Sequence, residues 1–320
     1  VEIYEPMSKR LPLRQRAIPY VFIAPGLLML ATFFAYPLLD TFWLSLHRYN
    51  IFNPPVWAGL DNFERAFGDE LFWRVTANTL LYAAMVVPAL VVVSFFLALL
   101  MNSTIRGIQI FRTVYYIPVV TSIVVAGIAW KWLYNSDGLI NAVLKGFGIA
   151  GPSWLADTRG VPEALLSFFG LEVTSGWFSE PCVALASVAM VTIWKASPYY
   201  MIIYLAGLQG IPPQLEEAAR VDGAGRWRIV RHITIPSIQP YTLVVSIIAT
   251  IGALRTFGEV YVMTSGGPFH RTNLLAYYIY TLGFKYLEVG YAAAVSLLLL
   301  GLILVFAVIN FRVAGGDADR

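Results

Sequence analysis

The sequence predicts an all-α integral membrane protein, and two observations carry that prediction. Of its 320 residues, 58% are hydrophobic and 13% are charged, and this charged fraction is about half that of a typical soluble domain. The charges are also unevenly placed, so that several stretches are long enough to cross a bilayer core of roughly 30 Å as helices. A soluble chain could not cover its surface with so few charges.

Six crossings are expected. Five stretches contain no Asp, Glu, Lys or Arg and are long enough to span: 17–39, 75–105, 113–130, 233–254 and 289–311. The fourth crossing in chain order, over about 181–208, is broken only by Lys195. The apolar stretch 272–284 is too short to span, so we expect it to lie in the interface or to re-enter.

The basic residues predict the orientation. If the amino terminus is inside, short inner segments hold twelve of the 22 Lys and Arg residues, longer outer loops hold nine, and Lys195 lies in a span. This distribution satisfies the positive-inside rule, mainly by density. The first apolar stretch is too long for a cleaved signal peptide, so we expect an uncleaved anchor. Both termini are then cytoplasmic, with tails 1–16 and 313–320 around a membrane domain over 17–312.

The motifs of several enzyme classes are missing from the sequence. It has no G-x-x-x-x-G-K-[ST] phosphate loop and no HExxH, GxSxG or EF-hand pattern. The single cysteine, Cys182, excludes a disulfide framework and a Cys-rich metal site, and the three histidines are scattered. A net charge of +3 without basic blocks gives no reason to expect a nucleic-acid partner. We therefore expect a non-catalytic chain that binds no cofactor or metal itself.

A short helix is expected on the inner side, between the fourth and fifth crossings. Pro212 and Pro213 suit its first turn, where a missing N–H costs nothing. Glu216 and Glu217 follow at positions where the helix dipole favours acids. Such a helix suits insertion into a cleft of another protein, and a solvated loop is the alternative.

Glycines mark the end of this short helix. Gly223 and Gly225 break it, and Asp222 is positioned to cap a second helix over about 226–234. That second helix is expected to stop or kink at Pro236.

The same segment resembles the EAA loop of binding-protein-dependent ABC importers. The matching string is Glu217-Ala218-Ala219, three residues, Gly223, nine residues, then Ile233-Thr234-Ile235-Pro236. The family pattern is EAA, three residues, G, nine residues and I-x-L-P, so the departure is Ile235 in place of leucine. The loop covers about 208–236, and its Asp222, Ala224 and Trp227 are similar to the carbohydrate-importer branch.

Other segments are similar to the maltose and glycerol-phosphate permease group, over about 17–312. They are Phe111-Arg112-Thr113, Ile117-Pro118, Gly138-Leu139-Ile140-Asn141, Trp194-Lys195 and Thr264-Ser265-Gly266-Gly267-Pro268. The Gly-Leu-Ile-Asn segment favours the subunit that resembles the larger maltose permease. Unlike that permease, this sequence shows no extra amino-terminal helices or large outer domain.

The resemblance implies a permease subunit in the inner membrane of a prokaryote. It would pair with a second six-helix permease, two cytoplasmic ATPase subunits that bind ATP and Mg, and an extracytoplasmic solute-binding protein. The substrate would be a sugar or related polyol. The residues expected to couple to the ATPase are Glu216, Glu217, Ala218, Ala219, Asp222, Gly223, Ala224 and Pro236.

The sequence gives weaker evidence for the substrate path than for the coupling helix. Lys195 lies inside the fourth crossing, where a charge is expensive, with no accompanying acid in the spans. It could line the pore, or it could fix helix packing through an ion pair or backbone carbonyls. Tyr199, Tyr200 and Tyr204 could stack on sugar rings or pack against neighbouring helices. Weaker candidates are Asn78, Thr121 and Ser197.

The long outer loop over 131–180 is a candidate surface for the binding protein. Its aromatic and acidic residues suit a transient interface, and anchoring in the membrane interface is the alternative. These residues are Trp132, Asp137, Trp154, Asp157, Trp177 and Glu180.

Two other transporter classes remain open at this point. One is an ABC permease for another polar solute, such as a polyamine or phosphate, against which the segments shared with the sugar permeases argue. The other is an ion-coupled secondary transporter, which would typically show internal repeats and paired intramembrane acids. A membrane enzyme is the least favoured reading.

Overall fold

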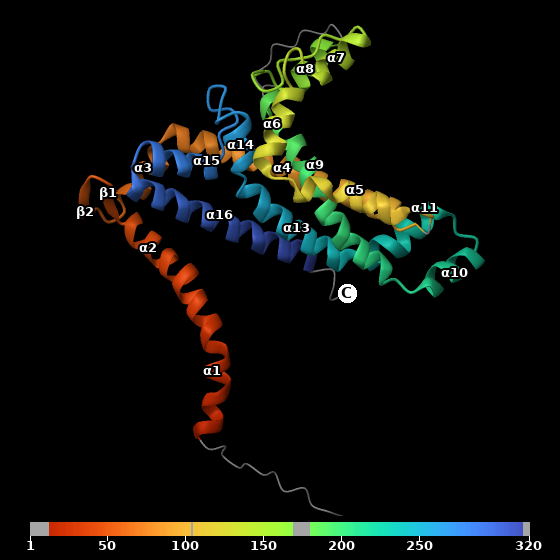
Figure 1. The fold of residues 1–320 in the computed structure, drawn as a ribbon, viewed down its shortest axis with the longest axis horizontal. Helices are drawn as coiled ribbons and strands as arrows, with labels where there is room; N and C mark the ends of the chain where they lie inside the picture. The colour runs from red at the N-terminus through yellow and green to blue at the C-terminus, as the bar shows by residue number, and fades with distance from the viewer. Residues whose placement is uncertain (1–12, 104, 169–179, 316–320) are drawn as a thin grey trace, which may run out of the picture.

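The computed structural model describes residues 13–103, 105–168 and 180–315. This part of the chain is almost entirely helical (Figure 1). The first long helix consists of α1 (Leu13–Leu30), a π-helical turn (Ala31–Ala35) and α2 (Tyr36–Ser45). It splays away from the other helices at its α1 end, and its most apolar window buries no residue within the chain.

A hairpin and a short helix follow the first long helix at one end of the molecule. They are β1 (His47–Asn50), the antiparallel β2 (Asn53–Trp57) and α3 (Asp61–Gly68). The buried Asn62 of α3 ties them together, because its Nδ2 donates to the carbonyls of Ser45 at 2.8 Å and His47 at 2.9 Å. Gly290 lies so close to the His47 carbonyl that an added Cβ would be 2.1 Å from it. The hairpin therefore seats directly on the helix that contains Gly290.

Four long helices form the main bundle. They are α4 (Glu70–Met101), α9 (Val183–Gln209), α13 (Gln239–Leu254) and α16 (Val289–Gly315). α9 packs along α4 and also contacts α13, and more than half of its residues are buried. Protein rather than lipid surrounds much of α9, so it tolerates Lys195, Pro198 and several hydroxyl groups.

Fewer than the expected six helices in the described ranges meet a simple criterion of length and mean hydropathy for a membrane span. In the described ranges, four helices are long and apolar enough to cross a membrane, and a bent helix pair could provide a fifth. α9, the expected fourth crossing, is not among them because its polar residues lower its mean hydropathy. Length and composition alone therefore do not reach the expected count of six.

The bent pair corrects the third expected crossing. The stretch 113–130 was expected to be one helix, but the chain forms α5 (Ile108–Val120) and α6 (Ile123–Leu133) at an angle of 96°. The backbone is extended at Thr121 and Ser122, with ψ values of 134° and 138°. A run of apolar residues does not by itself specify a straight helix. The helix can be interrupted where other groups bond to the backbone carbonyls that lose their helical partners.

Beyond the bend, α6 and the start of α9 rise out of the bundle as an arm (Figure 1). The arm also holds α7 (Leu139–Gly146) and α8 (Val161–Phe168).

The expected short inner helix is present as α10 (Pro213–Val221), which projects from one end of the bundle (Figure 1). It is followed by α11 (Arg226–Ile229), a π-helical turn (Val230–Thr234) and α12 (Ile235–Ser237). This second helical stretch breaks just after Pro236, as predicted. The predicted capping role of Asp222 is wrong, because Asp222 ends α10 and Gly225 is the residue that precedes α11.

The opposite end of the bundle holds α14 (Gly258–Met263), α15 (Leu275–Tyr280) and a π-helical turn (Thr281–Lys285). α15 packs against α4 and α16, and its Leu275, Tyr277 and Tyr278 are buried. The stretch 272–284 is thus helical from Leu275 onwards and is covered by protein on one side.

The structure describes only parts of the two predicted tails. Residues 13–16 of tail 1–16 belong to α1, and residues 313–315 of tail 313–320 belong to α16. The remainder of both tails lies outside the described residues.

Candidate functional sites

The helix α10 is built by local interactions. Pro212 precedes it and Pro213 is its first residue. At its end, the Gly223 amide donates to the Arg220 carbonyl at 3.0 Å and the Ala224 amide donates to the Ala219 carbonyl at 2.9 Å. This pair of backbone hydrogen bonds, with Gly223 at a φ of +79°, forms a Schellman motif. The motif stops the helix after nine residues and turns the chain back towards the bundle.

The surface of α10 is open. No residue of the helix is buried, and Glu217 and Ala218 are exposed. Glu216 forms an ion pair with Arg220 at 3.2 Å, one helical turn away. Within the described ranges, the Glu217 carboxylate has no hydrogen-bond or ion-pair partner. The helix thus presents a free carboxylate beside an alanine surface that allows close approach.

The remaining predicted coupling residues flank α10. Ala219 and Ala224 are half-buried, while Asp222, Gly223 and Pro236 are exposed. All eight predicted residues therefore lie in or beside one projecting segment, at the end of the bundle where α16 also ends (Figure 1).

A second site lies inside the bundle. An open cavity of about 370 Å³ is lined by α4, α9, α13, α14 and the start of α6. Its polar lining residues are Thr192, Tyr200, Arg255, Thr256 and Glu259. The other walls are apolar, and Gly252 opens space beside the Tyr200 hydroxyl. An apolar pocket with a few convergent polar groups is typical of small-molecule sites.

Lys195 fixes helix packing beside this cavity. Its Nζ donates to the carbonyls of Pro118 at 3.2 Å and Val119 at 3.3 Å. These carbonyls belong to the last turn of α5, where the bend leaves them without helical partners and where the helix dipole favours a cation. Of the two interpretations left open by the sequence, the geometry favours the carbonyl contact.

The expectation that no acid accompanies Lys195 is wrong. Glu259 interacts electrostatically with Lys195 and lines the cavity beside Thr192. The sequence alone places Glu259 in an outer loop, after the end of the fifth crossing. In the structure, the helix is interrupted at Arg255 but continues as α14, so that the fifth crossing extends over Gln239–Met263 and Glu259 lines the cavity.

Only Tyr200 among the predicted substrate-path residues lines the cavity. The Asn78 side chain instead donates to the carbonyls of His270 at 2.8 Å and Asn273 at 3.1 Å, which fixes the loop before α15 on α4. The other four serve helix structure or face outward. Thr121 bonds the Ile117 carbonyl, Ser197 and Tyr204 are buried in the bundle, and Tyr199 is exposed.

Sequence reasoning missed most of the cavity. Thr192, Arg255, Thr256 and Glu259 were not singled out, since each lies next to residues that read as ordinary span or loop. The available signal was the cluster of charged and hydroxyl residues directly after an apolar stretch, followed by Gly258. Such a cluster is expected where a membrane helix is interrupted beside a cavity.

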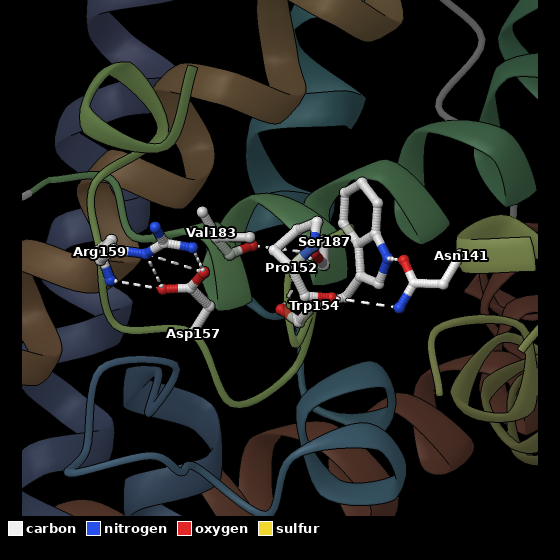
Figure 2. Close-up of polar contacts among 7 residues, drawn as sticks. All are labelled: Asn141, Pro152, Trp154, Asp157, Arg159, Val183 and Ser187. Carbon is white, nitrogen blue, oxygen red and sulfur yellow. Dashed lines mark hydrogen bonds and ion pairs between the residues drawn. The ribbon is translucent and has the colours of Figure 1, made fainter. Parts of the chain in front are cut away.

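The arm holds the predicted binding-protein surface and a larger cavity of about 970 Å³. Figure 2 shows that Trp154 points its indole nitrogen at Asn141, to which it donates at 2.8 Å. The Ser187 hydroxyl contacts the carbonyls of Val183 at 2.8 Å and Trp154 at 3.2 Å. Trp154 is therefore engaged within the arm rather than free for a partner.

The acidic residues of the arm are also partly engaged. Asp157 pairs with Arg159 at 2.7 Å, as Figure 2 shows, and Glu180 pairs with Arg271 at 2.6 Å. Trp132 and Asp137 are exposed. Trp177, the remaining predicted residue, lies outside the described residues.

A helical membrane bundle with a projecting helix at one end and a mainly apolar cavity that holds a few polar groups is typical of a transport permease subunit. The chain belongs to the family of binding-protein-dependent transport system inner membrane components, which it matches over residues 67–314.

Known relatives agree with this assignment. The chain is 31% identical to a trehalose/maltose transport system permease protein of Thermococcus litoralis, over 96% of this chain and 97% of the relative. It is also 31% identical to a lactose transport system permease protein of Rhizobium radiobacter, over 92% and 93%. In fold it is similar to a chain of a bacterial ABC transporter involved in alginate import. That similarity has a TM-score of 0.74 at 24% identity and covers 94% of this chain and 96% of that one.

Proposed function

We propose that this chain is the permease subunit of an ATP-driven importer for a sugar or related polyol. Family membership supports import with a binding protein, and relatives named for trehalose/maltose and lactose support the substrate class. The observation that carries the mechanism is α10, a short helix that projects from the bundle with no buried residue and with Glu217 unpaired among the residues that the structure describes. A helix with this surface suits a cleft on an ATPase subunit.

The parts of the importer would divide the work. A solute-binding protein delivers the sugar, a second permease completes the pore, and two ATPase subunits bind ATP and Mg. In this chain, α10 is joined to α9 on one side and, through α11 and α12, to α13 on the other. Both α9 and α13 line the cavity. When the ATPase subunits close, a displacement of α10 would reach the cavity through these two helices.

The same proposal sets the membrane topology. We count six crossings, with α9 as the fourth and the bent pair α5–α6 as the third, inside a domain over 17–312. α10 and the end of α16 lie at the same end of the bundle, which supports placing both on the cytoplasmic side (Figure 1). The exposed first helix leaves a long apolar surface for lipid or for the second permease.

Co-purification tests the assignment. The tagged chain would be expressed with the genes encoded beside it, extracted in mild detergent, and its companions identified by mass spectrometry. We expect an ATPase and a second permease with the wild-type chain. A Glu217→Arg variant should retain the second permease and lose the ATPase, because the contact is broken only at α10.

Two results would contradict the proposal. A chain that purifies alone or as a homo-oligomer would favour a stand-alone transporter. An ATPase that remains bound to Glu217→Arg as well as to an Asp137→Arg control, which reverses an exposed acid on the arm, would place the ATPase contact elsewhere.

A further inference from the structure

Four aromatic rings form a continuous row at the end of the bundle opposite α10. Phe257 stacks on Tyr261 with centroids 5.3 Å apart, Tyr280 contacts these two rings at 5.2 Å and 5.4 Å, and Tyr280 in turn stacks on Phe284 at 5.2 Å. The rings come from two separate segments, around α14 and around the end of α15. The fold therefore assembles the row from residues that are up to 27 positions apart, between Phe257 and Phe284. We call Phe257, Tyr261, Tyr280 and Phe284 the aromatic row.

The aromatic row is not part of the buried core. Phe284 is 75% exposed and Tyr261 is 43% exposed, while Phe257 and Tyr280 are half-buried. Behind the row, Tyr277 is 3% exposed and supports the Phe257 ring. The row thus keeps accessible ring surface on a rigid backing.

Polar groups accompany the rings. Tyr261 and Tyr280, whose rings meet edge-on, each bring a phenol hydroxyl to the row. Lys285 follows Phe284 in the sequence, and its Nζ donates to the Tyr277 hydroxyl at 2.9 Å. A surface that meets only lipid tails would not need these hydroxyl and ammonium groups, because each is costly without water.

One end of the aromatic row opens into the cavity. Phe257 lines the cavity beside Thr256 and Glu259. The other end, at Phe284 and Lys285, lies near the hairpin end of the bundle, where Glu288 pairs with Arg65 of α3. The row therefore connects the far end of the molecule with the cavity.

We propose that the aromatic row is a sugar-binding path that leads the substrate into the cavity. A pyranose ring has an apolar C–H face that packs on an aromatic ring, while its hydroxyls bond to polar groups at the ring edges. Successive rings at nearly constant spacing let a sugar move from one stacking position to the next without a deep energy well. The inference rests on the proposed function, because without sugar import the row has no cargo.

Uptake by the complete importer tests the path. Cells that express this chain with its co-encoded partner subunits are first given radiolabelled maltose, trehalose and lactose, and the best-transported sugar becomes the probe. Tyr261→Ala and Phe284→Ala should each reduce uptake at low sugar concentration by about fivefold to tenfold, since each removes a stacking position. Tyr261→Phe and Phe284→Trp keep a ring and should stay within about twofold of wild type.

Matched controls separate a path from general damage. Tyr286→Ala and Phe269→Ala remove exposed aromatic side chains of the same region, 60% and 80% exposed, that make no ring contact within the described ranges. They should leave uptake unchanged. All variants should purify with the wild-type amount of partner subunits.

Several outcomes would overturn the inference. It fails if the alanine variants transport normally, if ring-retaining variants do not rescue uptake, or if the controls lose as much activity. Loss of the second permease from the alanine variants would identify the row as a subunit interface instead. Wild-type cells that import none of the three sugars would remove the cargo and contradict the proposed substrate class as well, which a failure confined to the variants would not do.

Discussion

The projecting helix α10 and the internal cavity are specified in different ways. Every feature that shapes α10 lies within about a dozen residues, from Pro212 to Ala224, and the bonds that end it join neighbours. The cavity collects residues from five helices, and its supporting contacts join Lys195 to the end of α5, 76 and 77 positions away. A segment that is shaped by its neighbours in the sequence can be predicted from the sequence, whereas a site that depends on distant residues cannot. The two regions should also respond differently to mutation.

The largest effect is expected for Glu217→Arg. The change leaves the fold of α10 intact because Glu217 has no partner within the described ranges, but it would place like charges together at the proposed ATPase contact. Sugar uptake should fall at least about 100-fold, since such a juxtaposition costs several kcal/mol. Radiolabelled sugar uptake measures this, with membrane levels checked by immunoblot. Normal uptake would sink the coupling assignment, and Asp137→Arg should behave as wild type.

The second effect concerns stability and a long-range contact at the other end of the bundle. Asp69 caps α4 through the Leu71 amide and accepts hydrogen bonds from Tyr278 at 2.7 Å and Tyr291 at 2.9 Å. Asp69→Ala removes all three bonds and leaves two buried hydroxyls unpaired, at a cost of about 3 kcal/mol. Thermal unfolding of the purified complex should shift down, while Asp61→Ala, which removes an exposed ion pair with Arg48, should shift little.

The Asp69 contact also predicts a pH dependence. Burial raises the pKa of Asp69, but the hydrogen bonds from Tyr278, the Leu71 amide and Tyr291 outweigh it and lower the pKa below its ordinary value of 3.8. A lowered folded-state pKa means that the stabilisation is complete above the ordinary value and is lost as the pH falls through the folded value. Unfolding of Asp69→Asn should lack this acid component. An identical acid profile in wild type and Asp69→Asn would show that Asp69 is not responsible.

A smaller effect is expected at the bend between α5 and α6. Lys195→Met keeps the length of the side chain but leaves the Pro118 and Val119 carbonyls without their donor, at a cost of about 2 kcal/mol. The apparent unfolding temperature should fall by about 3 °C for a chain of this size. Lys195→Arg should recover most of the loss, because a guanidinium can still donate to both carbonyls. If Lys195→Met unfolds at the same temperature as wild type, the packing role is contradicted and Lys195 is again a candidate pore-lining residue.

The same contrast explains how far the sequence could be read. The all-helical membrane class, the position of α10 and its stop at Gly223 were predictable because hydrophobic length, proline and glycine act locally. The bend at Thr121 was not, because the carbonyls beside it are bonded by Lys195 from another helix. Nor was the continuation of the fifth crossing through α14, which brings Glu259 to the cavity, since the sequence around Glu259 resembles a loop. The sequence also could not show that the Asn78 side chain bonds to loop carbonyls while Tyr200 lines the cavity.

The smallest effect should be at Gly223, and it tests the idea of local encoding directly. Its φ of +79° disfavours a side chain, but a Cβ there would meet nothing within 4 Å. Gly223→Ala should therefore cost only about 1 kcal/mol of backbone strain, and Gly223→Asn less, because Asn tolerates the left-handed conformation. Uptake should fall by no more than a few-fold in either variant, with Asn closer to wild type. If both variants lose uptake as completely as Glu217→Arg, backbone strain cannot be the reason. The open space at Gly223 would then have to be filled by the ATPase itself, and the turn would be a contact as well as a stop.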